Sequence, residues 1–145
     1  MRHLLLLLAA LTAFCAFAIP VDSLLQKANL LIETSPDSAI ALCARLKSRH
    51  MDINQKARVY HTLGNALFAQ GEMEKAKQNF REAISYARQA GDKKTEASVL
   101  SDLGVCYRIT EKPDSALASY RQALVILQSI DAPIEEAYLL TSISV

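Results

Sequence analysis

The fold is decided by residues 57–83, which read ARVYHTLGNALFAQGEMEKAKQNFREA, and by residues 97–123, which read ASVLSDLGVCYRITEKPDSALASYRQA. The two stretches superimpose when Ala57 is placed on Ala97, and we call this shift one period. The residues identical in both are Ala57/Ala97, Val59/Val99, Leu63/Leu103, Gly64/Gly104, Ala76/Ala116, Arg81/Arg121 and Ala83/Ala123. A unit of this length cannot bury its apolar face alone, so we expect the units to stack.

Each unit has the same order of small and large residues. A Leu-Gly pair falls in a predicted first helix, and a small residue, an aromatic residue and an alanine follow in a predicted second helix. These repeat-defining residues are Leu63, Gly64, Ala76, Phe80 and Ala83 in one unit and Leu103, Gly104, Ala116, Tyr120 and Ala123 in the next. Small residues allow two helices to approach closely, and a large residue there would separate them. Lys77 is expected on the polar face of its helix.

This pattern resembles the tetratricopeptide repeat, in which every unit is a pair of antiparallel helices. The resemblance implies an all-α fold, a right-handed α-solenoid of antiparallel helix pairs. Two positions differ from the family pattern. Tyr60 and Leu100 stand where tryptophan is frequent, and Arg88 and Gln128 stand where a proline often closes the second helix. The period is longer than the commoner family length of about 34 residues, which implies longer helices or loops.

The boundaries follow from helix caps. Asp52 and Gln55 form a predicted capping box, while Gly71 and the pair Gly91-Asp92 mark helix ends. A degenerate earlier unit is predicted from Asp22 to about Glu33 and from Pro36 to about Arg49, because the segment around Pro36 recurs around Pro113. The predicted organisation is a signal peptide at 1–18, a degenerate helical hairpin at 19–51, repeats at 57–96 and 97–136, and the start of a further repeat at 137–145.

The N-terminus has the pattern of a secretory signal. Arg2 and His3 precede an apolar run, and Ala16-Phe17-Ala18 supplies the small residues that a signal peptidase recognises. We expect cleavage before Ile19 and export, to the periplasm or the medium. A retained membrane anchor and a lipoprotein attached through Cys15 are alternatives, although the bulky Phe14 disfavours the second. Cleavage would remove one basic residue, Arg2, and leave equal numbers of basic and acidic residues, so the cleaved chain has no general attraction for nucleic acid.

No catalytic or metal-binding constellation is apparent. His50 and His61 lack neighbouring ligands at metal-site spacing, and the serines of the predicted helices, Ser98, Ser101, Ser115 and Ser119, are expected to be ordinary exposed residues. Cys43 and Cys106 fall in the second and fifth predicted helices, too far apart for a disulfide, and are expected to be buried and reduced. We therefore expect neither enzyme activity nor a cofactor or metal ion.

Function is expected on the surface that stacking creates. The resemblance implies that the first helices line a concave face, and their register places there Arg58, His61, Asn65, Phe68, Ser101, Val105, Arg108 and Ile109. Asn65 matches an asparagine of the family members that clamp a peptide carboxylate. His61 replaces their lysine, and Asp102 would repel a carboxylate. The expected partner is therefore a protein or peptide segment bound in a more general groove.

Two functions remain open. One is an exported scaffold for protein or peptide binding, and the other is the N-terminal sensory or interaction region of a larger membrane-bound regulator with a histidine kinase or helix-turn-helix output. Val145 falls inside a predicted first helix without a cap, so we expect the chain to continue. Membrane attachment is expected only through a retained N-terminus or through sequence beyond Val145.

Overall fold

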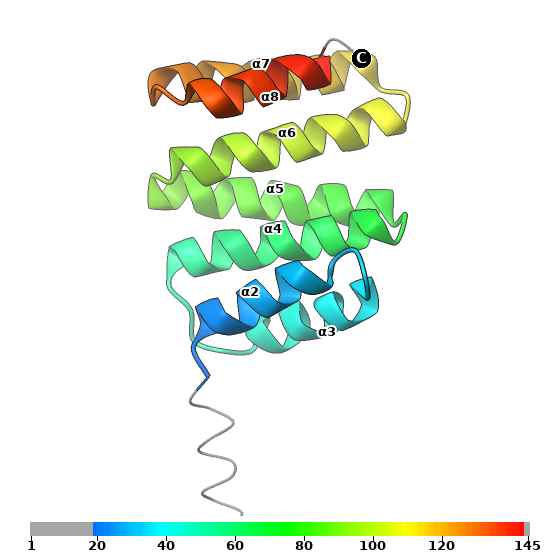
Figure 1. Cartoon of the computed structure of the whole chain (residues 1–145), viewed down its shortest axis with the longest axis vertical. Helices are drawn as coiled ribbons and strands as arrows, with labels where there is room; N and C mark the ends of the chain where they lie inside the picture. Colours follow the sequence, from blue (N-terminus) through cyan, green and yellow to red (C-terminus); the bar gives the residue numbers. More distant parts are fainter. Residues whose placement is uncertain (1–18, 144–145) are drawn as a thin grey trace, which may run out of the picture.

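The computed structural model describes residues 19–143, and these form a single stack of helices. The helices are α2 (Val21–Leu31), α3 (Pro36–Lys47), α4 (Ile53–Ala69), α5 (Met73–Ala90), α6 (Lys93–Ile109), α7 (Pro113–Ser129) and α8 (Pro133–Ile143). Each packs mainly on its neighbours in the chain, with α2 and α3 at one end and α7 and α8 at the other (Figure 1). No strand occurs within residues 19–143, and the all-α expectation is confirmed. The predicted signal peptide lies outside the described residues.

The helix boundaries repeat with the period of the sequence. The first helices begin at Ile53, Lys93 and Pro133, and the second helices begin at Met73 and Pro113, so corresponding helices start one period apart. Before α4, the predicted capping box is present: Asp52 accepts a hydrogen bond of 2.8 Å from the Gln55 backbone, and the Gln55 side chain accepts one from the Asp52 backbone. Local sequence therefore sets where α4 starts.

The connections also repeat, although their residues differ. Gly71 and Gly91 follow α4 and α5 with φ angles of 79° and 70°, in the left-handed region that glycine adopts without strain. The residues one period later, Glu111 and Asp131, have φ angles of 55° and 51°. The turn therefore requires a left-handed residue in both units, and in the second unit a residue with a side chain adopts it.

Within each repeat the glycine of the first helix makes room for the aromatic ring of the second. A Cβ atom added to Gly64 would lie 2.5 Å from a ring carbon of Phe80, and one added to Gly104 would lie 2.5 Å from a ring carbon of Tyr120. Both rings are almost completely buried, as are Ala83 and Ala123. The close helix pairs expected from the sequence are therefore present, and α4 and α6 lie directly against their partners α5 and α7.

Lys77 is not on a polar face, and that expectation was wrong. Its side chain is fully buried, with Nζ 2.5 Å from the Glu74 carboxylate and 5.5 Å from the centre of the Tyr107 ring. A lysine can bury its long apolar stem while its amine reaches a polar partner. The charge of the residue alone therefore does not show that its side chain is exposed. Ser119 was also expected to be exposed, but it is buried and donates a hydrogen bond of 2.9 Å to the Ser115 carbonyl.

A side-chain bridge spans the connection between consecutive units, at the position where the family often has proline. Arg88 near the end of α5 donates a hydrogen bond of 2.7 Å to Glu96 in the first turn of α6. The residues one period later repeat it, because Gln128 donates one of 2.9 Å to Glu136. These bridges tie each second helix to the following first helix.

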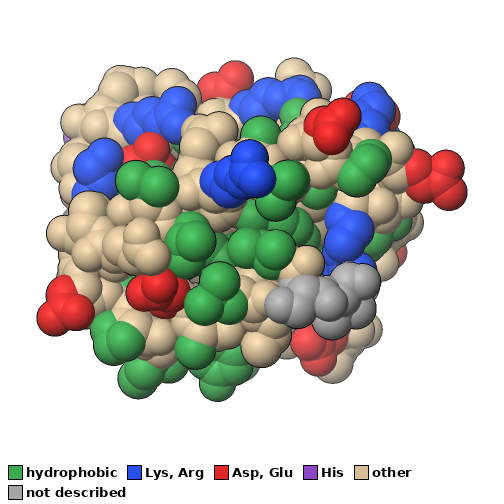
Figure 2. Space-filling view, turned by 90° about the horizontal axis from the view of Figure 1, so that it is seen from above, with side chains coloured by type: hydrophobic (Ala, Val, Ile, Leu, Met, Phe, Trp, Pro, Cys, Tyr) green, Lys and Arg blue, Asp and Glu red, His purple; other side chains and the backbone are tan. Residues whose placement is uncertain are grey.

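The end of the stack formed by α7 and α8 carries apolar side chains on its surface. In the view onto this end, hydrophobic side chains gather in the middle of the surface (Figure 2). The most exposed large apolar residues on the two helices are Val125, Ile134 and Tyr138, which are 66%, 69% and 72% exposed. Among residues 19–143, no helix combines the length and hydrophobicity needed to cross a membrane.

Candidate functional site

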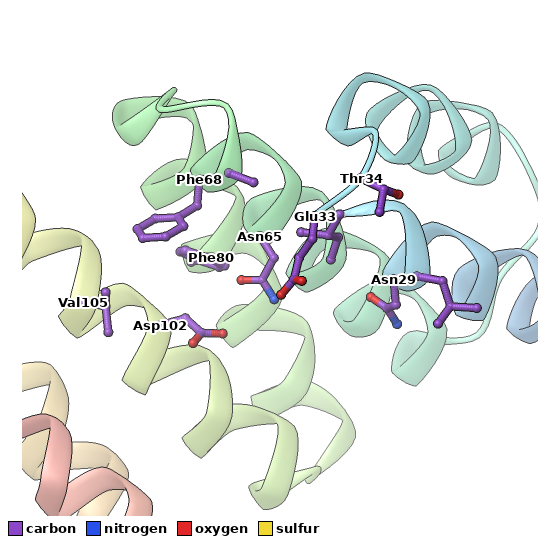
Figure 3. A pocket seen from close by; sticks show the side chains of 11 residues that line it. Asn29, Glu33, Thr34, Asn65, Phe68, Phe80, Asp102 and Val105 are labelled. Atoms are coloured by element: carbon purple, nitrogen blue, oxygen red, sulfur yellow. The ribbon is translucent and has the colours of Figure 1, made fainter.

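The main candidate site is a hollow on the side of the stack formed by the first helices, which we call the first hollow. It has a volume of about 630 Å³, within the range of pockets that bind ligands. Helices α2, α4 and α6 all contribute to it, together with the connection after α2 and one residue of α5 (Figure 3). Its lining consists of Asn29, Leu30, Ile32, Glu33, Thr34, Asn65, Phe68, Ala69, Phe80, Asp102 and Val105.

One wall of the first hollow is apolar. Phe68, Phe80 and Val105 lie on the same side of the space in the close view (Figure 3). Phe80 is held in place by its contact with Gly64, and the His61 ring packs against it edge to face, with ring centres 6.0 Å apart. The Phe80 ring is buried and packed, so it forms the base of this wall, and the surface open to a partner belongs to the half-buried Phe68 and Val105.

The polar groups of the first hollow are amides, hydroxyls and carboxylates. Glu33, Asn65 and Asp102 turn their polar ends toward the same space (Figure 3). Among the described residues, neither the Glu33 carboxylate nor the Asn65 amide has a hydrogen-bond partner. Asp102 is paired, because its Oδ2 lies 2.6 Å from Nε2 of His61 on the neighbouring first helix. The described lining contains no lysine, arginine or histidine.

A second, smaller hollow of about 250 Å³ lies between α6 and α8. Ser101, Asp102, Tyr138 and Ser142 belong to its lining, and Asp102 is shared with the first hollow. An ion pair of 2.7 Å between Lys94 and Glu135 joins α6 to α8 beside it. The His61–Asp102 and Lys94–Glu135 pairs both join one first helix to the next with the same separation in sequence, so successive first helices meet in the same way.

The structure brings together part of the predicted groove. Asn65, Phe68 and Val105 line the first hollow, Ser101 lines the second, and His61 contacts Asp102. Arg58 instead makes a hydrogen-bonded ion pair of 2.6 Å with Asp22 of α2. Arg108 and Ile109 are exposed and outside the lining of both hollows.

Residues of the N-terminal hairpin were missed by sequence reasoning. Asn29, Glu33 and Thr34 line the first hollow, although none was predicted to do so. The link between this hairpin and α4 is visible in the structure, because Thr62 donates a hydrogen bond of 2.8 Å to the Asn29 side chain. The available signal was the amphipathic pattern of residues 22–33, which marks α2 as a further first helix of the stack.

The described residues offer no assembled catalytic chemistry. Cys43 and Cys106 are both free and buried, as expected, and burial raises the pKa of each thiol to about 11. A thiol with this pKa is protonated at neutral pH and is a poor nucleophile. No group of three or more histidine, cysteine or carboxylate side chains suited to a metal ion occurs within residues 19–143.

The sequence matches the model of a known protein family. The family model described as tetratricopeptide repeat matches residues 55–129, which is just over half of the chain. The chain belongs to the tetratricopeptide repeat family. Tetratricopeptide repeats in general mediate protein–protein interaction and are generally not enzymes.

A solved structure agrees with this tetratricopeptide repeat assignment. The crystal structure of MamA is similar to this chain with a TM-score of 0.61 and 19% sequence identity, covering 92% of this chain and 80% of the MamA chain. At that identity the likeness shows the fold alone. Among curated proteins, none matches the sequence.

Proposed function

We propose that this tetratricopeptide repeat protein is an exported scaffold that binds a segment of a partner protein in its first hollow. The observation that carries the proposal is the hollow itself, which combines the half-buried Phe68 ring, backed by the buried Phe80, with the Glu33 and Asn65 side chains that have no partner among the described residues. Peptide-binding sites use this combination, because apolar anchors provide affinity and polar groups fix the orientation of the segment.

Replacing Phe68 by alanine tests the proposed site. Phe68 is half-buried in the wall of the first hollow, so its loss removes an anchor without opening the buried core. We expect Phe68→Ala to weaken partner capture by about 1 to 2 kcal/mol, as truncation of an interface anchor does, with little change in thermal unfolding. Capture by the immobilised protein from extracts of the source organism, followed by titration of the captured partner, measures this effect.

Arg121→Ala is the matched control, because Arg121 is exposed on α7, a second helix, away from the first hollow. Arg81 is a poorer control, since it donates a hydrogen bond of 2.8 Å to the Tyr107 hydroxyl. Arg108→Ala reports whether the partner extends past Val105 along α6. Loss of capture with Arg121→Ala, and normal capture with Phe68→Ala, would place the partner on the second helices and refute the proposal.

Export is the part of the proposal that concerns the N-terminus. The predicted cleavage point before Ile19 lies ahead of α2, which begins at Val21, so cleavage would remove none of the described helices. The Ile19 carbonyl accepts a hydrogen bond of 2.8 Å from Arg49, which would hold the new end of the chain against the stack. N-terminal sequencing of protein recovered outside the cytoplasm should begin at Ile19, and retention of Met1 would contradict cleavage.

A second candidate function is the interaction region of a larger membrane-bound regulator. The observation that favours it is the apolar surface of α7 and α8, where Ile134 and Tyr138 are 69% and 72% exposed. The residues one period earlier, Lys94 and Ser98, are polar, so the apolar character is particular to this end of the stack and suits a surface that a further element covers. Membrane fractionation of the native gene product distinguishes the two functions: a regulator would sediment with membranes, and a cleaved scaffold would remain in the exported soluble fraction.

A further inference from the structure

We infer that the segment bound in the first hollow carries an apolar side chain next to a lysine or arginine. This inference rests on the proposed function, since it names the chemistry of the segment that the hollow binds. It follows from the two carboxylates of the lining, Glu33, which has no partner among the described residues, and Asp102, which His61 contacts at 2.6 Å, with no lysine or arginine in the described lining.

Two cationic groups of the first helices are already paired, whereas Arg108, which is exposed one turn after Val105 on α6, has no ion-pair partner among the described residues. Arg58 is held by Asp22 at 2.6 Å, and Lys94 is held by Glu135 at 2.7 Å. The Arg58 and Lys94 side chains are therefore not available to neutralise a carboxylate in the first hollow. His61 orients Asp102 through their contact of 2.6 Å, whereas Glu33 has no partner among the described residues. A bound segment would thus meet a negative potential that is strongest on the Glu33 side.

The geometry of the lining places this negative charge beside the apolar wall. In the close view, Glu33 and Asp102 lie on either side of Asn65, and Phe80 lies between Asn65 and Phe68 (Figure 3). A segment whose apolar side chain packs on Phe68 therefore has its adjacent residue close to the carboxylates. A lysine or arginine at that residue gains attraction, and a glutamate or aspartate is repelled. The unpaired Asn65 amide can hydrogen-bond the backbone of the same segment.

Three pools of peptides test this inference. Each pool consists of nonapeptides with acetylated and amidated ends, random residues from a neutral set at the outer positions, and a fixed central pair. The central pair is Leu-Lys, Leu-Gln or Leu-Glu, so that the pools differ only in the charge of one side chain. Retention on the immobilised chain is measured at about 0.05 M and about 0.5 M salt, where the screening length differs severalfold.

We expect the chain to retain the Leu-Lys pool about fivefold better than the Leu-Glu pool at low salt, with Leu-Gln between them. High salt should reduce the preference, since the Glu33 carboxylate is exposed. Glu33→Gln should reduce it to about twofold, and Asp102→Asn should reduce it further. Glu82→Gln is the matched control, because it removes an exposed carboxylate from α5 outside the first hollow and should leave the preference unchanged.

The outcomes separate this inference from the proposed function. Equal retention of the three pools that is lost with Phe68→Ala would overturn the charge preference and keep the binding site. A preference for Leu-Glu, or a preference for Leu-Lys that survives both Glu33→Gln and Asp102→Asn, would also overturn the inference. If the chain retained none of the pools, or retained them equally well after Phe68→Ala, the proposed binding site itself would be refuted.

Discussion

Gly64 and Phe80 show how single residues define the repeat. The phenyl ring occupies the volume that any side chain at position 64 would need, and Tyr120 does the same over Gly104. The glycine was predictable as a point of close approach because it recurs with its aromatic partner one period later. Lys77 was not predictable in the same way, since its counterpart in the next unit is Leu117 and only the packed structure reveals that its stem is buried.

Gly64→Leu should therefore lower the free energy of unfolding by about 1 to 3 kcal/mol or more, because the ring of Phe80 cannot move without disturbing the core. Urea unfolding followed by circular dichroism measures the change. The milder Gly64→Ala should be partly rescued by Phe80→Leu, as expected for two residues in contact. Gln78→Ala, at an exposed position of α5, is the control and should change the free energy by less than about 0.5 kcal/mol. Unfolding midpoints that did not separate Gly64→Leu from Gln78→Ala would contradict this packing.

At the scale of the elements, the helix ends were the most predictable feature. Asp52 caps α4, and Gly91 and Asp92 end α5 and cap α6, in agreement with the sequence signals. The turns of the second unit could not be predicted from glycines. Glu111 and Asp131 take the left-handed conformation there, at the positions where the first unit has Gly71 and Gly91. Residue type alone therefore does not indicate these two turns.

Replacing Glu111 by glycine should stabilise the protein. Glycine would remove the strain of a side chain in the left-handed region, which costs about 1 to 2 kcal/mol. Its greater freedom in the unfolded chain would offset about 0.5 to 1 kcal/mol of this gain. We expect Glu111→Gly to raise the free energy of unfolding by about 0.5 to 1 kcal/mol, measured by urea unfolding. Glu82→Gly, inside α5, should lower it by about 1 kcal/mol. Destabilisation by Glu111→Gly would contradict the strained turn.

The bridge between α5 and α6 predicts a response to pH. Burial favours a higher pKa for Glu96, but hydrogen bonds from Arg88 and Lys93 outweigh it and hold the pKa below its ordinary value of 4.5. The unfolded state therefore binds the proton more readily, so the contribution of this bridge to stability is present above about pH 4.5 and is lost as the pH falls through the folded pKa.

Glu96→Gln should accordingly lower the free energy of unfolding at pH 7 and should weaken its dependence on pH below about 4.5. Urea unfolding at several pH values between about 3 and 7 measures both effects. Glu82→Gln removes an exposed carboxylate from α5 and serves as the comparison. If the acid dependence of Glu96→Gln matched that of the parent chain, the bridge would have no energetic role.

For the molecule as a whole, the repeat period predicts the stack and part of the lining of the first hollow. Asn65, Phe68 and Val105 reach the first hollow because the register of the first helices places them there. Glu33 and Asn29 could not be assigned from that register, since α2 lies before the regular repeats and its start at Val21 is less than one period ahead of α4. The amphipathic pattern of residues 22–33 indicates a further first helix, but it does not give the register in which the hairpin packs on α4.

In the proposed function, the first helices together form the binding surface. Amide hydrogen exchange of the chain, with and without its captured partner, tests this most directly because it reports on every helix at once. We expect slower exchange around the connection after α2 and in the C-terminal halves of α4 and α6, which line the first hollow. Slower exchange confined to α5 and α7, with α4 and α6 unchanged, would contradict the proposed function.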